Sequence, residues 1–133
     1  MAAAGHTAHR REKFLSILQE IFNTEGRLNR LSYLKYMVIL AVIVGIATFV
    51  TSSMITFLTG DPTGFPIKMI TLIWAVVAGA GNIMLMIRRL HDLGKSGYFA
   101  LLALVPVIGI IFSIYLFCAP GQYGANQYGY RPA

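Results

Sequence analysis

Charged residues are scarce in this sequence and cysteine is nearly absent. Only 12% of the 133 residues are Asp, Glu, Lys or Arg, whereas 56% are hydrophobic. Cys118 is the sole cysteine, which excludes an internal disulfide. No P-loop, nucleophile elbow or zinc-ligand spacing occurs, and Asp61 and Asp92 are too far apart in the expected topology to act as a carboxylate pair. We therefore expect neither an enzyme nor a bound cofactor or metal.

Long apolar runs are what the sequence has instead. Residues 37–58, 69–87 and 98–119 are uncharged and mostly hydrophobic. Each run is about 20 residues long, which as a helix crosses a hydrocarbon core about 30 Å thick. A backbone in lipid must satisfy its own hydrogen bonds, so helices are expected. The sequence predicts an all-α membrane protein with three transmembrane helices, built as one membrane domain over residues 12–133.

The positions of the basic residues predict the orientation of these spans. The net charge is +6, and nine of the 11 Lys and Arg residues precede the first run or lie between the second and third. The positive-inside rule assigns those segments to the cytoplasm, so we expect a cytoplasmic N-terminus and a periplasmic C-terminus. Basic residues at span ends pair with anionic lipid headgroups, which explains the charge without nucleic acid.

The N-terminal segment has two parts. Residues 1–11 are alanine-rich and are expected to be disordered. Residues 12–22 show apolar side chains at helical spacing, which predicts an amphipathic helix. That helix either lies in the membrane interface or packs on the cytoplasmic ends of the spans, and its pattern suits both contacts.

A candidate site lies just inside the expected cytoplasmic surface. Arg27, Arg30 and Tyr33 share one helical face before the first span, and a dense polar cluster ends the second span. We expect the two groups to converge, with Asp92 neutralising one arginine and the others binding an anionic headgroup or a partner protein. The alternative is simple anchoring of helix ends by snorkelling arginines. The cluster residues are Arg88, Arg89, His91 and Asp92.

Helix packing and the third run give further predictions. Ala75, Gly79 and Asn82 would let the second span approach a neighbour closely, with Asn82 hydrogen-bonded across the contact. Pro106 and Gly109 predict a kink in the third span. The alternative is a re-entrant hairpin bent at these residues, which would return the tail to the cytoplasm.

Three motifs together resemble a known family. They are GRLNRLSY at residues 26–33, RRLHDLGKSG at 88–97 and PGQYGANQYG at 120–129. The order and sequence of these motifs resemble the YhaH-like bacterial inner-membrane family, domain of unknown function 805. Leu34 and Tyr98 stand where members commonly carry tryptophan. The resemblance implies the inner membrane and a glycine-rich tail over residues 120–133, whose motif residues are Pro120, Gly121, Gly124, Asn126, Tyr128 and Gly129.

The functional expectation is correspondingly modest. The sequence favours a multi-pass inner-membrane protein with a structural or accessory role, whose basic cluster engages anionic phospholipid or a partner protein. The alternative is one subunit of an oligomeric transporter or channel. A transport pathway normally has charged side chains inside the membrane, which distinguishes the two functions. Asn82 is the one strongly polar side chain well inside an expected span, which favours the structural or accessory role.

Overall fold

The architecture is entirely helical over the residues described. The computed structural model describes residues 2–130, with side chains from residue 9 onward. Within that range no strand forms, and an isolated bridge joins Asn126 and Gly129. The elements are α1 (Ala2–Ile21), α2 (Arg30–Thr59), α3 (Phe65–Asp92), the 3₁₀-helix η1 (Gly97–Leu104) and α4 (Pro106–Cys118).

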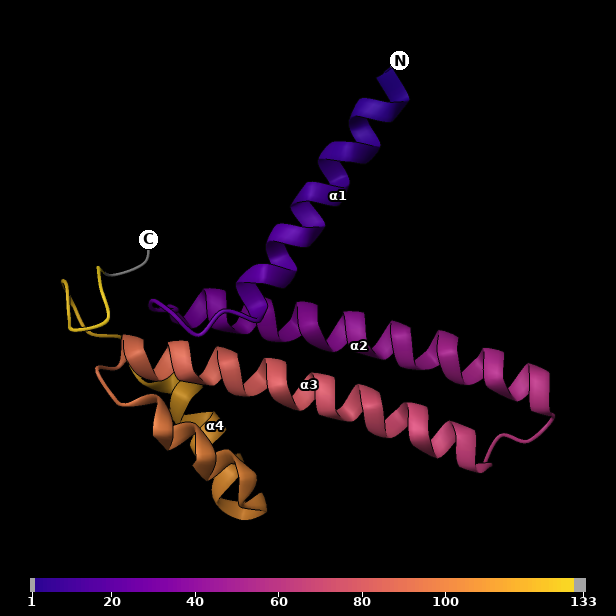
Figure 1. The fold of residues 1–133 in the computed structure, drawn as a ribbon. Coiled ribbons are helices and arrows are strands. Elements are labelled where there is room, and N and C mark those ends of the chain that lie inside the picture. The colour runs from indigo at the N-terminus through magenta and orange to yellow at the C-terminus, as the bar shows by residue number, and fades with distance from the viewer. Residues whose placement is uncertain (1, 131–133) are drawn as a thin grey trace.

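The two long helices form an antiparallel pair (Figure 1). α2 has 30 residues and α3 has 28, and both are long and apolar enough to cross a membrane. At 1.5 Å per residue they are about 45 and 42 Å long. Asn29 caps α2, because its side chain accepts the Ser32 backbone N–H at 2.7 Å. Gly60 ends α2 in the left-handed region at φ +70°.

The contact between α2 and α3 is made at Gly81. A Cβ at Gly81 would lie 2.9 Å from Leu40 Cδ2, so the missing side chain is what lets α2 approach. Trp74 Nε1 donates to Thr51 Oγ1 at 3.2 Å across the same contact. The prediction for Gly79 was wrong, because a Cβ there would meet nothing within 4 Å. Residues two apart on a helix point about 200° from each other, so only one of these glycines can face α2.

The rest of the expected packing face also differs. Ala75 is exposed, and Asn82 Oδ1 is buried without a hydrogen-bond partner instead of bonding across a helix contact.

The third apolar run reverses direction instead of continuing as one kinked helix. Eight residues of η1 and 13 of α4 give two short arms. These arms are about 16 and 20 Å long, and neither reaches the roughly 30 Å that a span needs. Of the two interpretations of this run, the structure has the hairpin bent at Pro106 and Gly109, and we keep the name re-entrant hairpin for η1 and α4. The single kinked span predicted over residues 98–119 is therefore wrong.

Proline explains where the reversal falls. Pro106 has no N–H and disfavours helical backbone at the preceding residue, and Val105 is accordingly extended at φ −91° and ψ 114°. Gly109 then lets α4 fold back on η1, since a Cβ there would lie 2.6 Å from the Ala103 carbonyl oxygen. Pro106 and Gly109 are thus the residues of a turn and not of a kink.

The tail consequently lies at the same end of the helix pair as the end of α3. The Gln122 backbone N–H donates to the Asp92 carbonyl at 2.9 Å. We call this end, where α1, the start of α2, the end of α3 and the tail meet, the basic end (Figure 1). The expectation that the C-terminus lies across the membrane from the N-terminal segment is contradicted by this arrangement. Residues 131–133 of the predicted tail lie outside the described residues.

α1 begins earlier than expected and leaves the basic end away from both long helices (Figure 1). Residues 2–11, predicted as disordered, belong to this helix, and their several alanines are the strongest helix formers. At its other end Ile21 is fully buried and Ile17 packs on the same core. Phe14 and Leu15 stay 48% and 55% exposed. The end of α1 therefore packs on α3, and its middle presents a free apolar surface.

Candidate functional site

Asp92, the last residue of α3, is the centre of a buried polar cluster at the basic end. Its Oδ1 accepts Arg27 Nε at 3.2 Å and pairs with Arg27 Nη2 at 3.1 Å. Its Oδ2 accepts Arg89 Nη1. The side chains of both arginines are fully buried, and that of Asp92 is 3% exposed. We call Arg27, Arg89 and Asp92 the arginine–aspartate cluster.

Arg27 holds the C-terminal tail. Its Nη1 donates to the carbonyls of Gly124 at 2.6 Å and Gly129 at 3.3 Å, and its Nη2 donates to that of Gln122 at 2.6 Å. With the Nε bond to Asp92, the guanidinium makes four hydrogen bonds within the chain, and its Nη2 also lies in the ion pair with Asp92. The Arg27 side chain is fully buried and bonded within the chain, contrary to the expectation that it binds a headgroup.

Arg89 holds the end of the re-entrant hairpin. Its Nε donates to the Leu116 carbonyl at 2.9 Å, and its Nη2 donates to that of Ala119 at 2.5 Å. These carbonyls lie at the C-terminus of α4, where the last turn lacks partners of its own and carries partial negative charge. Arg89 Nη1 also donates to the Leu28 carbonyl at 3.3 Å. Arg89 thus joins the segment before α2, the end of α3 and the end of α4.

Arg88 has a different partner from the one predicted. It pairs with Glu20 of α1, with 2.6 Å between Nη2 and Oε1, and also donates to the Glu20 carbonyl at 2.7 Å. The expected Arg88–Asp92 pair does not form, because Asp92 faces Arg89, three residues earlier on the helix. Positions three and four apart are both neighbours on a helix, so spacing alone did not decide between the two arginines.

His91 and the tail complete the cluster. The His91 ring stacks on Tyr128 with 3.8 Å between ring centroids, and its Nδ1 lies 3.2 Å from the Gly26 carbonyl oxygen. Asn126 Nδ2 donates to the His91 carbonyl at 2.8 Å and so joins the tail to the end of α3. Gly121 packs against the Asp92 carboxylate so closely that no Cβ fits there.

Two predicted site residues stand apart from these bonds. Arg30 is exposed. Tyr33 is 1% exposed, belongs to the core, and has a hydroxyl without a hydrogen-bond partner. Of the three arginines expected to bind an anion, only Arg30 therefore presents its guanidinium to the surroundings.

An interfacial groove of about 570 Å³ opens beside the cluster. Its inner wall is apolar and comes from α3 and η1, with Ile83, Ile87, Ala100 and Leu101. Its polar side chains are Thr24, His91, Ser96, Tyr98 and Tyr128. Gly97 lies against Ile87 and His91, because a Cβ at Gly97 would lie 2.9 Å from Ile87 Cγ2 and 3.4 Å from His91 Nε2.

Sequence reasoning did not include the groove or several of the cluster's partners. The carbonyls of Leu116, Ala119 and Gln122 carry no signal in the sequence, because every residue has one. Among the described residues, no group of three or more His, Cys, Asp or Glu side chains is placed to hold a metal ion.

A membrane-length helix pair, a re-entrant hairpin and a tail clamped by buried arginines define a small helical membrane protein. The chain belongs to the family described as protein of unknown function (DUF805), whose model matches residues 21–130. The three motifs that carry the resemblance are the segments that meet in the arginine–aspartate cluster.

Curated relatives agree on the location. The chain is 29% identical to inner membrane protein YhaI of Escherichia coli (strain K12) over 119 residues, which covers 90% of this chain and 93% of that protein. It is 32% identical to inner membrane protein YhaH of the same strain over 119 residues, covering 90% and 94%. No solved structure matches the chain significantly. The protein is therefore an inner-membrane protein of an uncharacterised family.

Proposed function

We propose that this protein is a structural or accessory protein of the inner membrane that holds one anionic phospholipid in the interfacial groove. The observation that carries the proposal is the division of the groove into an apolar wall and a set of polar side chains at the basic end. A phospholipid has the matching division between acyl chain and headgroup. The wall of Ile83, Ile87, Ala100 and Leu101 suits an acyl chain, and Thr24, His91 and Ser96 suit the headgroup.

The proposed topology has α2 and α3 crossing the membrane with the basic end in the cytoplasm. The positive-inside rule supports this side, because nine of 11 basic residues lie in segments at that end. Both termini are then cytoplasmic, and the re-entrant hairpin enters and leaves from the same face. α1 lies in the interface with Phe14 and Leu15, which are exposed, toward the acyl chains.

Two of the arginines that the sequence favoured are not available to the headgroup, and Arg30, which is exposed, does not line the groove. Arg27 and Arg89 are buried and bonded to carbonyls and to Asp92. Lys95 is exposed, adjoins Ser96 of the groove and extends over the Phe99 ring at 5.9 Å. A lysine near an anionic surface contributes about 1 kcal/mol, so Lys95 supplies the preference for a negative headgroup in this proposal.

Native mass spectrometry of the protein with phosphatidylglycerol or phosphatidylcholine tests the proposal. We expect a preference for phosphatidylglycerol that Lys95→Gln reduces about fivefold, the equivalent of roughly 1 kcal/mol. Lys13→Gln in α1 removes the same charge away from the groove and serves as the control. Leu101→Trp should narrow the groove and weaken the binding of both lipids. Val107 is also exposed and apolar but lies outside the groove, so Val107→Trp should leave the binding of both lipids unchanged. Equal retention of both lipids by all variants would contradict the proposal.

The alternative of an oligomeric transporter or channel subunit has less support. Between Lys68 and Arg88 the second long helix carries no charged side chain, and α2 carries none after Lys35. Intramembrane charge is what ion and substrate pathways normally show.

A further inference from the structure

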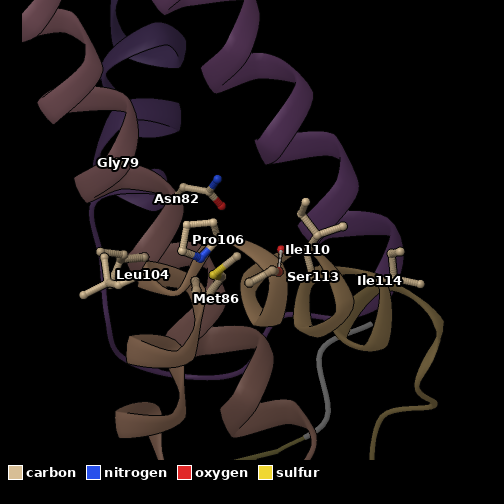
Figure 2. Close-up of a pocket in the computed structure, with 11 residues that line it drawn as sticks. Gly79, Asn82, Met86, Leu104, Pro106, Ile110, Ser113 and Ile114 are labelled. Atoms are coloured by element: carbon tan, nitrogen blue, oxygen red, sulfur yellow. Dashed lines mark hydrogen bonds between the residues drawn. The ribbon is translucent and has the colours of Figure 1, made fainter.

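A second cavity lies deeper, between α3 and the re-entrant hairpin (Figure 2). It has a volume of about 480 Å³, and its walls are mostly apolar. Asn82 is ten residues from the end of α3, which places it about 15 Å along the helix from the basic end. At that depth the cavity lies within a hydrocarbon core about 30 Å thick. The apolar walls include Ile83, Met86, Leu104, Ile110 and Ile114.

Two polar atoms of the residues that line this cavity, Asn82 Oδ1 and Ser113 Oγ, are available as hydrogen-bond acceptors. Asn82 Oδ1 is buried and has no partner, and Figure 2 shows the Asn82 amide extending from α3 toward Pro106 and Ile110 of the hairpin. Ser113 Oγ donates its own proton to the Gly109 carbonyl at 2.8 Å, so toward the cavity it can only accept. A buried acceptor without a partner costs about 1–3 kcal/mol, and a ligand that donates to it removes that cost.

The cavity is too large and too apolar for a single water to account for it. One water occupies about 30 Å³ and needs two to four polar partners. Leu104, Ile110 and Ile114 border the cavity and are 66%, 66% and 59% exposed, so its opening faces lipid once the helices are in a membrane. A ligand therefore arrives from the bilayer and not from water.

We infer that this cavity binds a neutral, largely apolar membrane-soluble molecule that carries a hydroxyl group, with the hydroxyl donating to Asn82 Oδ1. The apolar wall accommodates the body of the molecule, and the two acceptors, Asn82 Oδ1 and Ser113 Oγ, select the hydroxyl. A charged ligand is excluded by the same geometry, because no ionised side chain lines the cavity. This inference is independent of the interfacial groove, since of the cavity's lining only Ile83 also lines the groove.

Paired photoreactive probes test the inference on the full chain in bilayers. One probe is a long-chain alcohol with a diazirine, and the other is its methyl ether, which lacks only the hydroxyl proton. A hydrogen bond between groups in a membrane changes affinity by about threefold or more. We expect the alcohol to label residues 79–86 or 103–114 at least about threefold more than the ether at equal concentration.

Two variants make the result decisive. Asn82→Leu keeps the size of the side chain and removes the acceptor, so the preference for the alcohol should disappear. Gly79→Leu fills the cavity from a position where a Cβ meets nothing within 4 Å, so the fold should persist while both probes lose labelling. Ser53→Ala on the exposed face of α2 is the matched control and should label as the unmodified chain does. Equal labelling by alcohol and ether in the unmodified chain, or undiminished labelling of Gly79→Leu, would overturn the inference.

Discussion

Replacement of Asp92 by Asn is the sharpest test of the arginine–aspartate cluster. The substitution preserves the shape of the side chain but removes the one negative charge that two fully buried arginines share. Removing one partner of a buried ion pair costs about 3–5 kcal/mol, because the other charge stays buried without compensation. We expect Asp92→Asn to lower the free energy of unfolding by about that amount.

A matched carboxylate-to-amide change exists on the same side of the molecule. Glu20 also pairs with an arginine, but its side chain is 40% exposed. The Arg88 side chain is only 7% exposed, so this pair is intermediate between a surface pair and a buried pair, and Glu20→Gln should cost about 1–2 kcal/mol. The two variants should differ by about 1–4 kcal/mol, or roughly 5- to 700-fold in the equilibrium constant.

The measurement is reversible unfolding in mixed micelles, followed by the fluorescence of Trp74. This residue is the single tryptophan, and it sits in the contact between α2 and α3. A double variant of Arg27→Gln with Asp92→Asn should lose less than the sum of the single losses, since the groups are in contact. If Asp92→Asn and Glu20→Gln differ by less than about 1 kcal/mol, the cluster is no stronger than the half-exposed Arg88–Glu20 pair and the reasoning fails.

Three further changes test other parts of the structure. Gly81→Leu should cost about 1–3 kcal/mol in the same unfolding assay, because it overpacks the contact with α2, whereas Gly79→Leu should be close to neutral. Gly121→Ala should detach the tail, and faster backbone amide exchange in residues 122–130 would report it; Gln127→Ala is the control, and equal exchange in both would contradict the clamp. A reporter at the C-terminus should be cytoplasmic and one in the turn between α2 and α3 periplasmic; a periplasmic C-terminal reporter would refute the proposed topology.

The residue types at two helix ends agree with the local structure. Asn29 caps α2 as its residue type favours, and Gly94 ends the turn after α3 at φ +69°, the left-handed conformation that glycine adopts at least cost. The meeting of the Arg27 and Asp92 segments also follows from the sequence, because alternate basic segments lie on one side of a membrane.

The pairing inside the cluster could not be predicted in the same way. Arg88 and Arg89 are both within reach of Asp92 on a helix, and the choice was made by Glu20, which takes Arg88 through the packing of α1. The course of residues 98–119 was likewise ambiguous. A proline in a long apolar run is compatible with a kinked span as well as with a hairpin. The bonds that favour the hairpin join Arg89 to the end of α4, and contacts between residues so far apart cannot be read from the sequence.

The clamp on the tail also sets an order for synthesis. Arg27 and Arg89 are made before the carbonyls of Leu116, Ala119 and Gln122, to which they donate. Until then both guanidinium groups must stay hydrated at the membrane surface, because an unpaired charge is too costly to bury. The basic end therefore closes only after residues 116–122 have been made, and a chain that stops before them leaves both arginines exposed.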